Sequence, residues 1–159
     1  MTRKYLWVPF LLYFTLLAKL ILFKKQIGAV SYESYSEVLS FRQNLDRINL
    51  VPFRSTMSLL HEGINLFVIQ NIGGNIFGFT PLGIFLPILF PSLSSFSKVF
   101  ITVFAISTGF ELVQLVTVLG VCDIDDVILN TLGGIFGFIL YKVFFYFLPR
   151  RNNYSAQQL

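Results

Sequence analysis

Polar side chains recur at one-turn spacing inside three long apolar stretches of this sequence. Residues at positions i, i+4 and i+7 share one face of a helix, so each set predicts a polar stripe turned away from lipid. The carboxyl of Glu111 could act with Asp126 as an acid and base, and Asp123 with Asp126 and Asn130 could hold a hard cation. The three sets are Asn71, Asn75 and Gly78; Ser107, Glu111 and Gln114; and Asp126, Asn130, Gly133 and Gly137.

A purely structural interpretation competes with this chemistry. Polar side chains hold membrane helices together by hydrogen bonds, and aspartates at the start of a helix cap its free N–H groups. Asp123, Asp125 and Asp126 exceed what one cap needs, which favours a ligand contact. The sequence has no zinc motif, no phosphate-binding loop and a single cysteine, Cys122, so neither a metal nor a cofactor is expected. Catalysis stays open, and a non-enzymatic role is favoured.

The composition places these stripes in a membrane protein. Of 159 residues, 55% are hydrophobic and 13% are charged, with a mean hydropathy of +0.72. Soluble domains carry about 25% charged residues, so a disordered chain, a nucleic-acid-binding arm and a water-facing enzyme are excluded. The chain has twelve Lys and Arg and eight Asp and Glu, so it is basic overall. The basic residues flank apolar runs, which indicates positive charge at the membrane surface and no nucleic-acid partner. One all-α membrane domain is predicted at 1–148, followed by a polar, basic tail at 149–159.

Four stretches have the roughly 20 apolar residues that a membrane span requires. They lie at about 5–23, 69–90, 99–118 and 127–148. Between the first two, residues 31–41 and the set Met57, Leu60, Ile64 and Phe67 predict two short interfacial helices, the first of which could equally be a loop. An extended turn at 49–53 separates them. The residues expected to shape the fold are Pro52, Pro81, Gly83, Gly133 and Gly137.

The second and fourth spans share a short near-repeat. Residues 71–79 and 130–138 match at six of nine positions, and both spans run in the same direction. Gly74 with Gly78, and Gly133 with Gly137, have the spacing that lets helices approach closely, so a parallel pair is expected. The same glycine faces could support a homo-oligomer, and a true duplication would favour a small transporter or an assembly subunit.

An even number of spans puts both termini on one side of the membrane. Basic residues are equally frequent on the two sides, but Arg3-Lys4 and Arg150-Arg151 adjoin helix ends, and the 119–126 loop holds acids without Lys or Arg. These features favour cytoplasmic termini. Span parity also places all the polar stripes in the same half of the membrane, which predicts a polar cavity open to the outside of the cell.

Four short motifs in this order resemble the VanZ-like family of bacterial membrane proteins. They are Arg47-Ile-Asn-Leu-Val-Pro-Phe53, Gly74-Asn75 with Phe79-Thr-Pro-Leu-Gly83, Ser107-x-x-x-Glu111-x-x-Gln114, and Asp123-Ile-Asp-Asp126 followed by Asn130-Thr-Leu-Gly133. Many members carry an arginine about three residues before the first loop aspartate, where this chain has Gly120. The glycine form is similar to members from glycopeptide-resistance clusters.

The resemblance implies a protein of the bacterial cell membrane that lowers susceptibility to the lipoglycopeptide teicoplanin. It also implies that the matched residues are the functional ones. We expect the cavity to engage membrane lipid head groups or the drug in its lipid-anchored form, through Asn71, Asn75, Ser107, Glu111, Gln114, Asp123, Asp126 and Asn130. The alternative is an intramembrane enzyme acting on a lipid-linked substrate such as a cell-wall precursor.

Overall fold

Four long helices dominate the computed structural model, which describes residues 3–23, 45, 48–61 and 63–147. Each is long and apolar enough to cross a membrane, so the predicted all-α, four-span architecture is confirmed. The spans are α1 (Trp7–Leu22, continuing the 3-10 turn η1, Arg3–Leu6), α5 (Leu66–Leu89), α6 (Phe96–Thr117) and α7 (Ile124–Phe147). A short helix, α4 (Arg54–His61), precedes α5, and a 3-10 turn, η2 (Pro91–Leu93), follows it. The predicted helix at 31–41 and the tail at 149–159 lie outside the described residues.

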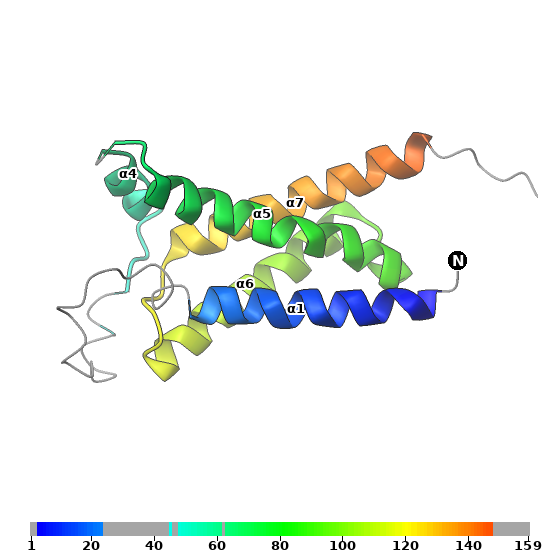
Figure 1. Cartoon of the computed structure of the whole chain (residues 1–159), viewed down its shortest axis with the longest axis horizontal. Coiled ribbons are helices and arrows are strands. Elements are labelled where there is room, and N and C mark those ends of the chain that lie inside the picture. Colours follow the sequence, from blue (N-terminus) through cyan, green and yellow to red (C-terminus); the bar gives the residue numbers. More distant parts are fainter. Residues whose placement is uncertain (1–2, 24–44, 46–47, 62, 148–159) are drawn as a thin grey trace, which may run out of the picture.

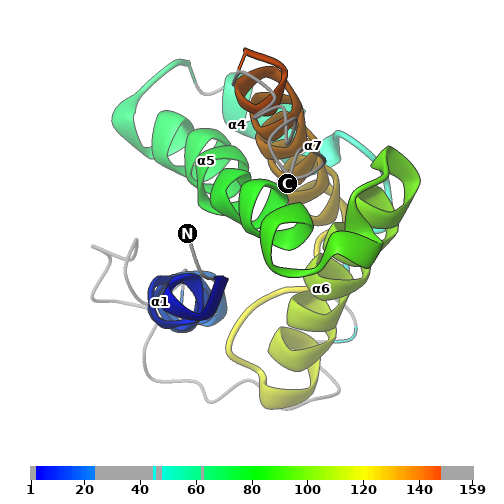
Figure 2. The same cartoon turned by 90° about the vertical axis from the view of Figure 1, so that its right-hand side faces the viewer.

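Successive long helices run in opposite directions along the bundle (Figure 1). Leu22, Leu66, Thr117 and Ile124 therefore meet at one end of the bundle, which we call the loop end. In the second view, α1 lies against α5 and α6 on the side away from α7 (Figure 2). The acidic connection between α6 and α7 and the short helix α4 both lie at the loop end.

Side-chain caps explain why two spans begin earlier than the hydropathy alone predicts. The side chain of Asn65 accepts a hydrogen bond from the Val68 N–H at 3.0 Å, which starts α5 at Leu66. Asp123 accepts from the Asp125 N–H at 2.9 Å and starts α7 at Ile124. The prediction that one of the aspartates caps the fourth span is thus confirmed, and the capping residue is Asp123.

Helix α5 continues through Pro81 and Pro87. Each proline lacks the N–H that would bond the carbonyl one turn earlier. Near these positions, other donors reach the helix backbone: the Thr80 hydroxyl donates to the Ile76 carbonyl at 2.9 Å, and the Tyr13 hydroxyl donates to the Gly78 carbonyl at 2.7 Å. The second bond also joins α1 to α5.

The predicted second interfacial helix is wrong at its C-terminal end. Helix α4 ends at His61, and Gly63 has φ +92°, a left-handed conformation that breaks the helix. Ile64 consequently lies in the connection and Phe67 lies in the first turn of α5. No residue of α4 is buried.

Helices α5 and α7 form a parallel pair with their backbones in contact, as predicted. A Cβ on Gly83 would lie 1.9 Å from the Gly134 carbonyl oxygen, and one on Gly137 would lie 1.9 Å from the Thr80 carbonyl oxygen. A Cβ on Gly133 would likewise lie only 2.1 Å from the Ile76 carbonyl oxygen. These positions admit no side chain, so glycine is required there by close approach.

The expected contribution of Gly74 and Gly78 to this pair is wrong. A Cβ on Gly74 would meet nothing within 4 Å, and one on Gly78 would lie 3.5 Å from Leu17 of α1. Helix α5 instead meets α7 through the face of Ile76, Thr80 and Gly83. The near-repeat therefore marks two different faces on the two helices.

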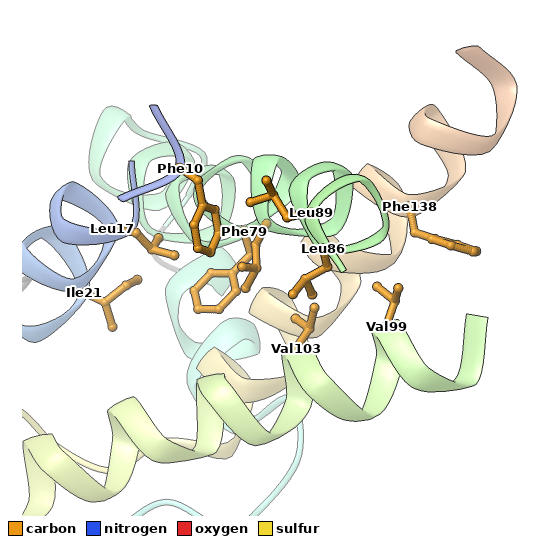
Figure 3. Close-up of a cluster of buried hydrophobic side chains, with 10 residues drawn as sticks. Phe10, Leu17, Ile21, Phe79, Leu86, Leu89, Val99, Val103 and Phe138 are labelled. Atoms are coloured by element: carbon orange, nitrogen blue, oxygen red, sulfur yellow. The ribbon is translucent and has the colours of Figure 1, made fainter. Parts of the chain in front are cut away.

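An apolar core fills the space between α1, α5 and α6. It includes Leu17 and Ile21 from α1, Phe79 and Leu86 from α5, and Val103 from α6, with further members shown in Figure 3. Large apolar side chains elsewhere on the spans are exposed, as expected for surfaces that face lipid.

Replacing Gly137 by alanine should destabilise the protein, because the new methyl group would overlap the Thr80 carbonyl of α5. We expect a loss of about 2 kcal/mol or more in the free energy of unfolding in detergent, as for overpacked cores. Gly74→Ala is the matched control and should change it by less than about 0.5 kcal/mol. Equal stabilities for the two variants would contradict the close packing of α5 on α7.

Candidate acid–amide site

Asp123 joins three segments of the chain at the loop end. Its backbone N–H donates to Oε2 of the buried Glu111 at 2.8 Å. Its carboxylate oxygen Oδ1 accepts from the Asn49 side-chain amide and from the Asp125 N–H, both at 2.9 Å. The α6–α7 connection is therefore tied back onto α6 and onto the segment that precedes α4.

The segment around Asn49 pairs with this connection as a single parallel β-bridge. The Asn49 N–H donates to the Cys122 carbonyl at 3.0 Å, and the Ile124 N–H donates to the Asn49 carbonyl at 2.9 Å. The Asn49 side chain also donates to the Ser55 hydroxyl at 2.9 Å. Pro52 lies in the turn that follows, which agrees with the predicted extended turn at 49–53.

Asp125 caps a helix far from it in the sequence. Its buried carboxylate accepts hydrogen bonds from the backbone N–H groups of Phe53 and Thr56, the latter at 2.8 Å, and so caps the first turn of α4. Phe53 has φ +64°, a strained conformation for a residue with a side chain. Asp125 was not among the predicted ligand-binding residues, because its partners are backbone groups that no side-chain pattern reveals.

Two further contacts join α7 to its neighbours within the membrane-spanning region. The Asn75 amide of α5 donates to Asp126 Oδ1 at 2.6 Å, and the Asn130 amide donates to the Ser107 hydroxyl of α6 at 2.8 Å. Asn75, Ser107 and Asn130 are buried. The prediction that three polar stripes share one interior seam at one end of the bundle is therefore confirmed for these residues.

Gln114 and Asn71 lie at the margins of this arrangement. The Gln114 amide donates to the Ile21 carbonyl in the last turn of α1 at 2.9 Å and so joins α6 to the end of α1. A Cβ on Gly120 would lie 2.9 Å from Gln114 Nε2, so a larger residue there would displace this side chain. Asn71 is partly exposed and, within the described part of the chain, makes no hydrogen bond to the cluster.

We call Asn49, Asn75, Ser107, Glu111, Asp123, Asp125, Asp126 and Asn130 the acid–amide cluster. Asp123 and Asp126 are partly exposed, whereas Glu111 lies behind them with 1% exposure. The buried oxygen Asn130 Oδ1 has no hydrogen-bond partner among the described residues. The cluster thus presents acceptor oxygens, and the open cavity expected around them stays a prediction. The described residues include no group of three His, Cys, Asp or Glu side chains arranged to hold a metal ion.

Cys122 lies beside the carboxylates of the cluster. Partial burial of its thiol raises its pKa, and the negative charges of Glu111 and Asp123 raise it further, because both effects disfavour a thiolate. The thiol is free and only partly buried, so it reports on the charge of these neighbours.

These features define the class: a multi-pass helical membrane protein whose spans meet in an acid–amide cluster at one end. The chain belongs to the VanZ/LLP1 family, whose model matches residues 10–145. It is 32% identical to "Protein VanZ" of Enterococcus faecium over 130 residues, which cover 82% of this chain and 69% of that protein. No solved structure matches the chain. The four motifs that suggested the family all contribute residues to the cluster.

Replacing Glu111 by glutamine should make Cys122 more reactive. Loss of the neighbouring charge lowers the pKa of the thiol, so more thiolate is present at a given pH and alkylation moves to lower pH. The measurement is the rate of iodoacetamide labelling against pH in detergent. Glu111→Asp keeps the charge and is the control. Superimposable profiles for Glu111→Gln and the unmodified protein would mean that Glu111 carries no charge near the thiol.

Proposed function

We propose that this VanZ-like protein lowers the susceptibility of a bacterium to teicoplanin-type lipoglycopeptide antibiotics. The family membership and the relationship to Protein VanZ support a link to glycopeptide resistance. In this proposal the protein lies in the cell membrane with both termini in the cytoplasm, and the loop end faces outward.

The observation that carries the proposal is the convergence of the family motifs on Asp123. Its backbone bonds Glu111, and its carboxylate bonds Asn49, so residues from three of the motifs meet at a single position. Helix packing alone does not require a carboxyl as deeply buried as Glu111, and intramembrane ionisable residues more often serve function. Two strained positions, Phe53 with φ +64° and Val118 with φ +58°, also lie at the loop end, where strain is a common mark of a functional site.

The chemistry of the cluster suits a ligand that donates hydrogen bonds or carries positive charge. Asp123 and Asp126 present carboxylate oxygens at the accessible edge, and Asn130 Oδ1 adds a buried acceptor. Carboxylates attract cations and donors most strongly where water is scarce. A lipid head group with an ammonium, or the polar part of an antibiotic, provides such groups.

The depth of the cluster favours a ligand held in the membrane by an acyl chain. The accessible edge of the cluster, Asp123 and Asp126, lies at the loop end where α7 begins, and we place this edge at the level where lipid head groups meet the hydrocarbon core. An acyl-bearing glycopeptide places its polar portion at this same level. We therefore propose that the cluster engages a lipid head group or the lipid-anchored drug.

Glu111→Gln and Asp126→Asn should abolish protection against teicoplanin while leaving the protein in the membrane. Both substitutions keep a side chain that can accept the observed hydrogen bond, so the fold should persist, whereas the negative charge is lost. The measurement is the minimal inhibitory concentration beside the amount of protein in isolated membranes. For both variants the minimal inhibitory concentration should fall to that of cells without the protein, while the amount of protein in the membranes should not change.

Asn71→Ala provides the matched control for these variants. Asn71 lies one turn from Asn75 on α5 but outside the cluster, so its loss should leave protection intact. Full protection by both charge-neutralised variants would exclude the cluster from the mechanism.

The proposed orientation is tested with the single native cysteine. A membrane-impermeant maleimide added to intact cells should label Cys122, because it lies at the loop end. A second cysteine, Ser94→Cys in a Cys122→Ser background, lies between α5 and α6 at the opposite end and should be labelled only after permeabilisation. The reverse labelling pattern would mean that the loop end faces the cytoplasm and that both termini lie outside the cell.

A further inference from the structure

Helix α4 has three distinct faces although it contains only eight residues. The face toward the bundle is half-buried and mostly polar, a second face is exposed and apolar, and a third is exposed and polar. The half-buried face is Ser55, Thr56 and Leu59; the apolar face, counting the residue before the helix, is Phe53, Met57 and Leu60; the polar face is Arg54, Ser58 and His61. The apolar strip is therefore not used to pack α4 onto the protein.

The surroundings of α4 indicate what covers this strip. Helix α4 lies at the loop end beside the first turns of α5, as Figure 1 shows. Ile64, in the connection between the two helices, and Leu66 and Phe67, in the first turn of α5, are exposed apolar residues as well. The strip is thus continuous with a surface that a membrane span presents to lipid.

We propose that α4 inserts its apolar strip into the lipid leaflet at the loop end, and that Asp125 is the residue that holds it in this rotation. A helix with one apolar and one cationic or polar flank lies in the plane of the membrane interface with its apolar side toward the acyl chains. Arg54, on the polar flank, then lies at the level of the lipid phosphates. The partner is the phospholipid leaflet itself, and the proposed resistance function does not require this insertion of α4.

Asp125 is placed to set the rotation of α4, because little else fixes the helix. No α4 side chain is buried, so apolar packing does not lock it. The two carboxylate oxygens of Asp125 bind two different backbone N–H groups, Oδ1 that of Phe53 and Oδ2 that of Thr56. Two acceptors on two donors fix both the position and the direction of the first turn. Asn49, bonded to Ser55, adds a third polar contact on the same side.

Tryptophan scanning in liposomes tests the insertion. Trp7 is the single tryptophan, so Trp7→Phe provides a silent background. In that background we expect Met57→Trp, on the apolar strip, to be quenched by lipids brominated on the acyl chains at least about twofold more than Ser58→Trp, its neighbour on the polar face. The vesicles contain phosphatidylglycerol and phosphatidylcholine. Equal quenching at the two positions would overturn the insertion.

The role of Asp125 is tested by adding Asp125→Asn to the same two tryptophan variants. Asparagine has the same shape, but an NH2 group that only donates replaces one of the two carboxylate oxygens, so one of the two N–H groups loses its acceptor. The difference in quenching between positions 57 and 58 should therefore shrink. An unchanged difference would overturn the positioning role. The first pair of variants leaves Asp125 intact, so the insertion itself is judged even where Asp125→Asn does not fold.

Discussion

The arrangement depends on the cost of burying a polar side chain inside the membrane without a hydrogen-bonding partner. Glu111 is buried near the end of α6, and its carboxylate receives the backbone N–H of Asp123 across the α6–α7 connection. This bond folds the connection back onto the bundle and fixes where α7 begins. Once α7 is fixed, Asp126 lies opposite Asn75 and Asn130 lies opposite Ser107. The same constraint thus orders three helices.

The connection between α6 and α7 also organises a part of the chain about seventy residues earlier in the sequence. Asn49 bonds Cys122 and Ile124 through its backbone and Asp123 through its side chain, while Asp125 caps α4. The neighbouring aspartates therefore have different structural roles. Asp123 and Asp125 hold the architecture of the loop end, and Asp126 bonds to α5. Neutralising one of them is consequently not equivalent to neutralising another, although they adjoin in the sequence.

The length of the apolar stretches predicted the spans. Helical periodicity predicted the buried polar seam, because a residue's type and spacing decide which face of a membrane helix avoids lipid. It did not predict the partners of Asp125, which are backbone groups of a segment about seventy residues earlier. The glycine spacing at Gly74 and Gly78 was misleading because small residues permit close packing without specifying which neighbour supplies it. The end of α4 depends on the positive φ of Gly63, which a run of apolar residues at helical spacing conceals.

The backbone contact between α5 and α7 restricts how this protein can change shape. Sliding either helix along the other would drive a carbonyl oxygen of α5 into the chain of α7 at Gly133 or Gly137. We therefore expect these two helices to move together. Helix α1, bonded to its neighbours through Tyr13 and Ile21, carries no such lock. A rearrangement around Glu111 is therefore expected to move the outer helices relative to this central pair.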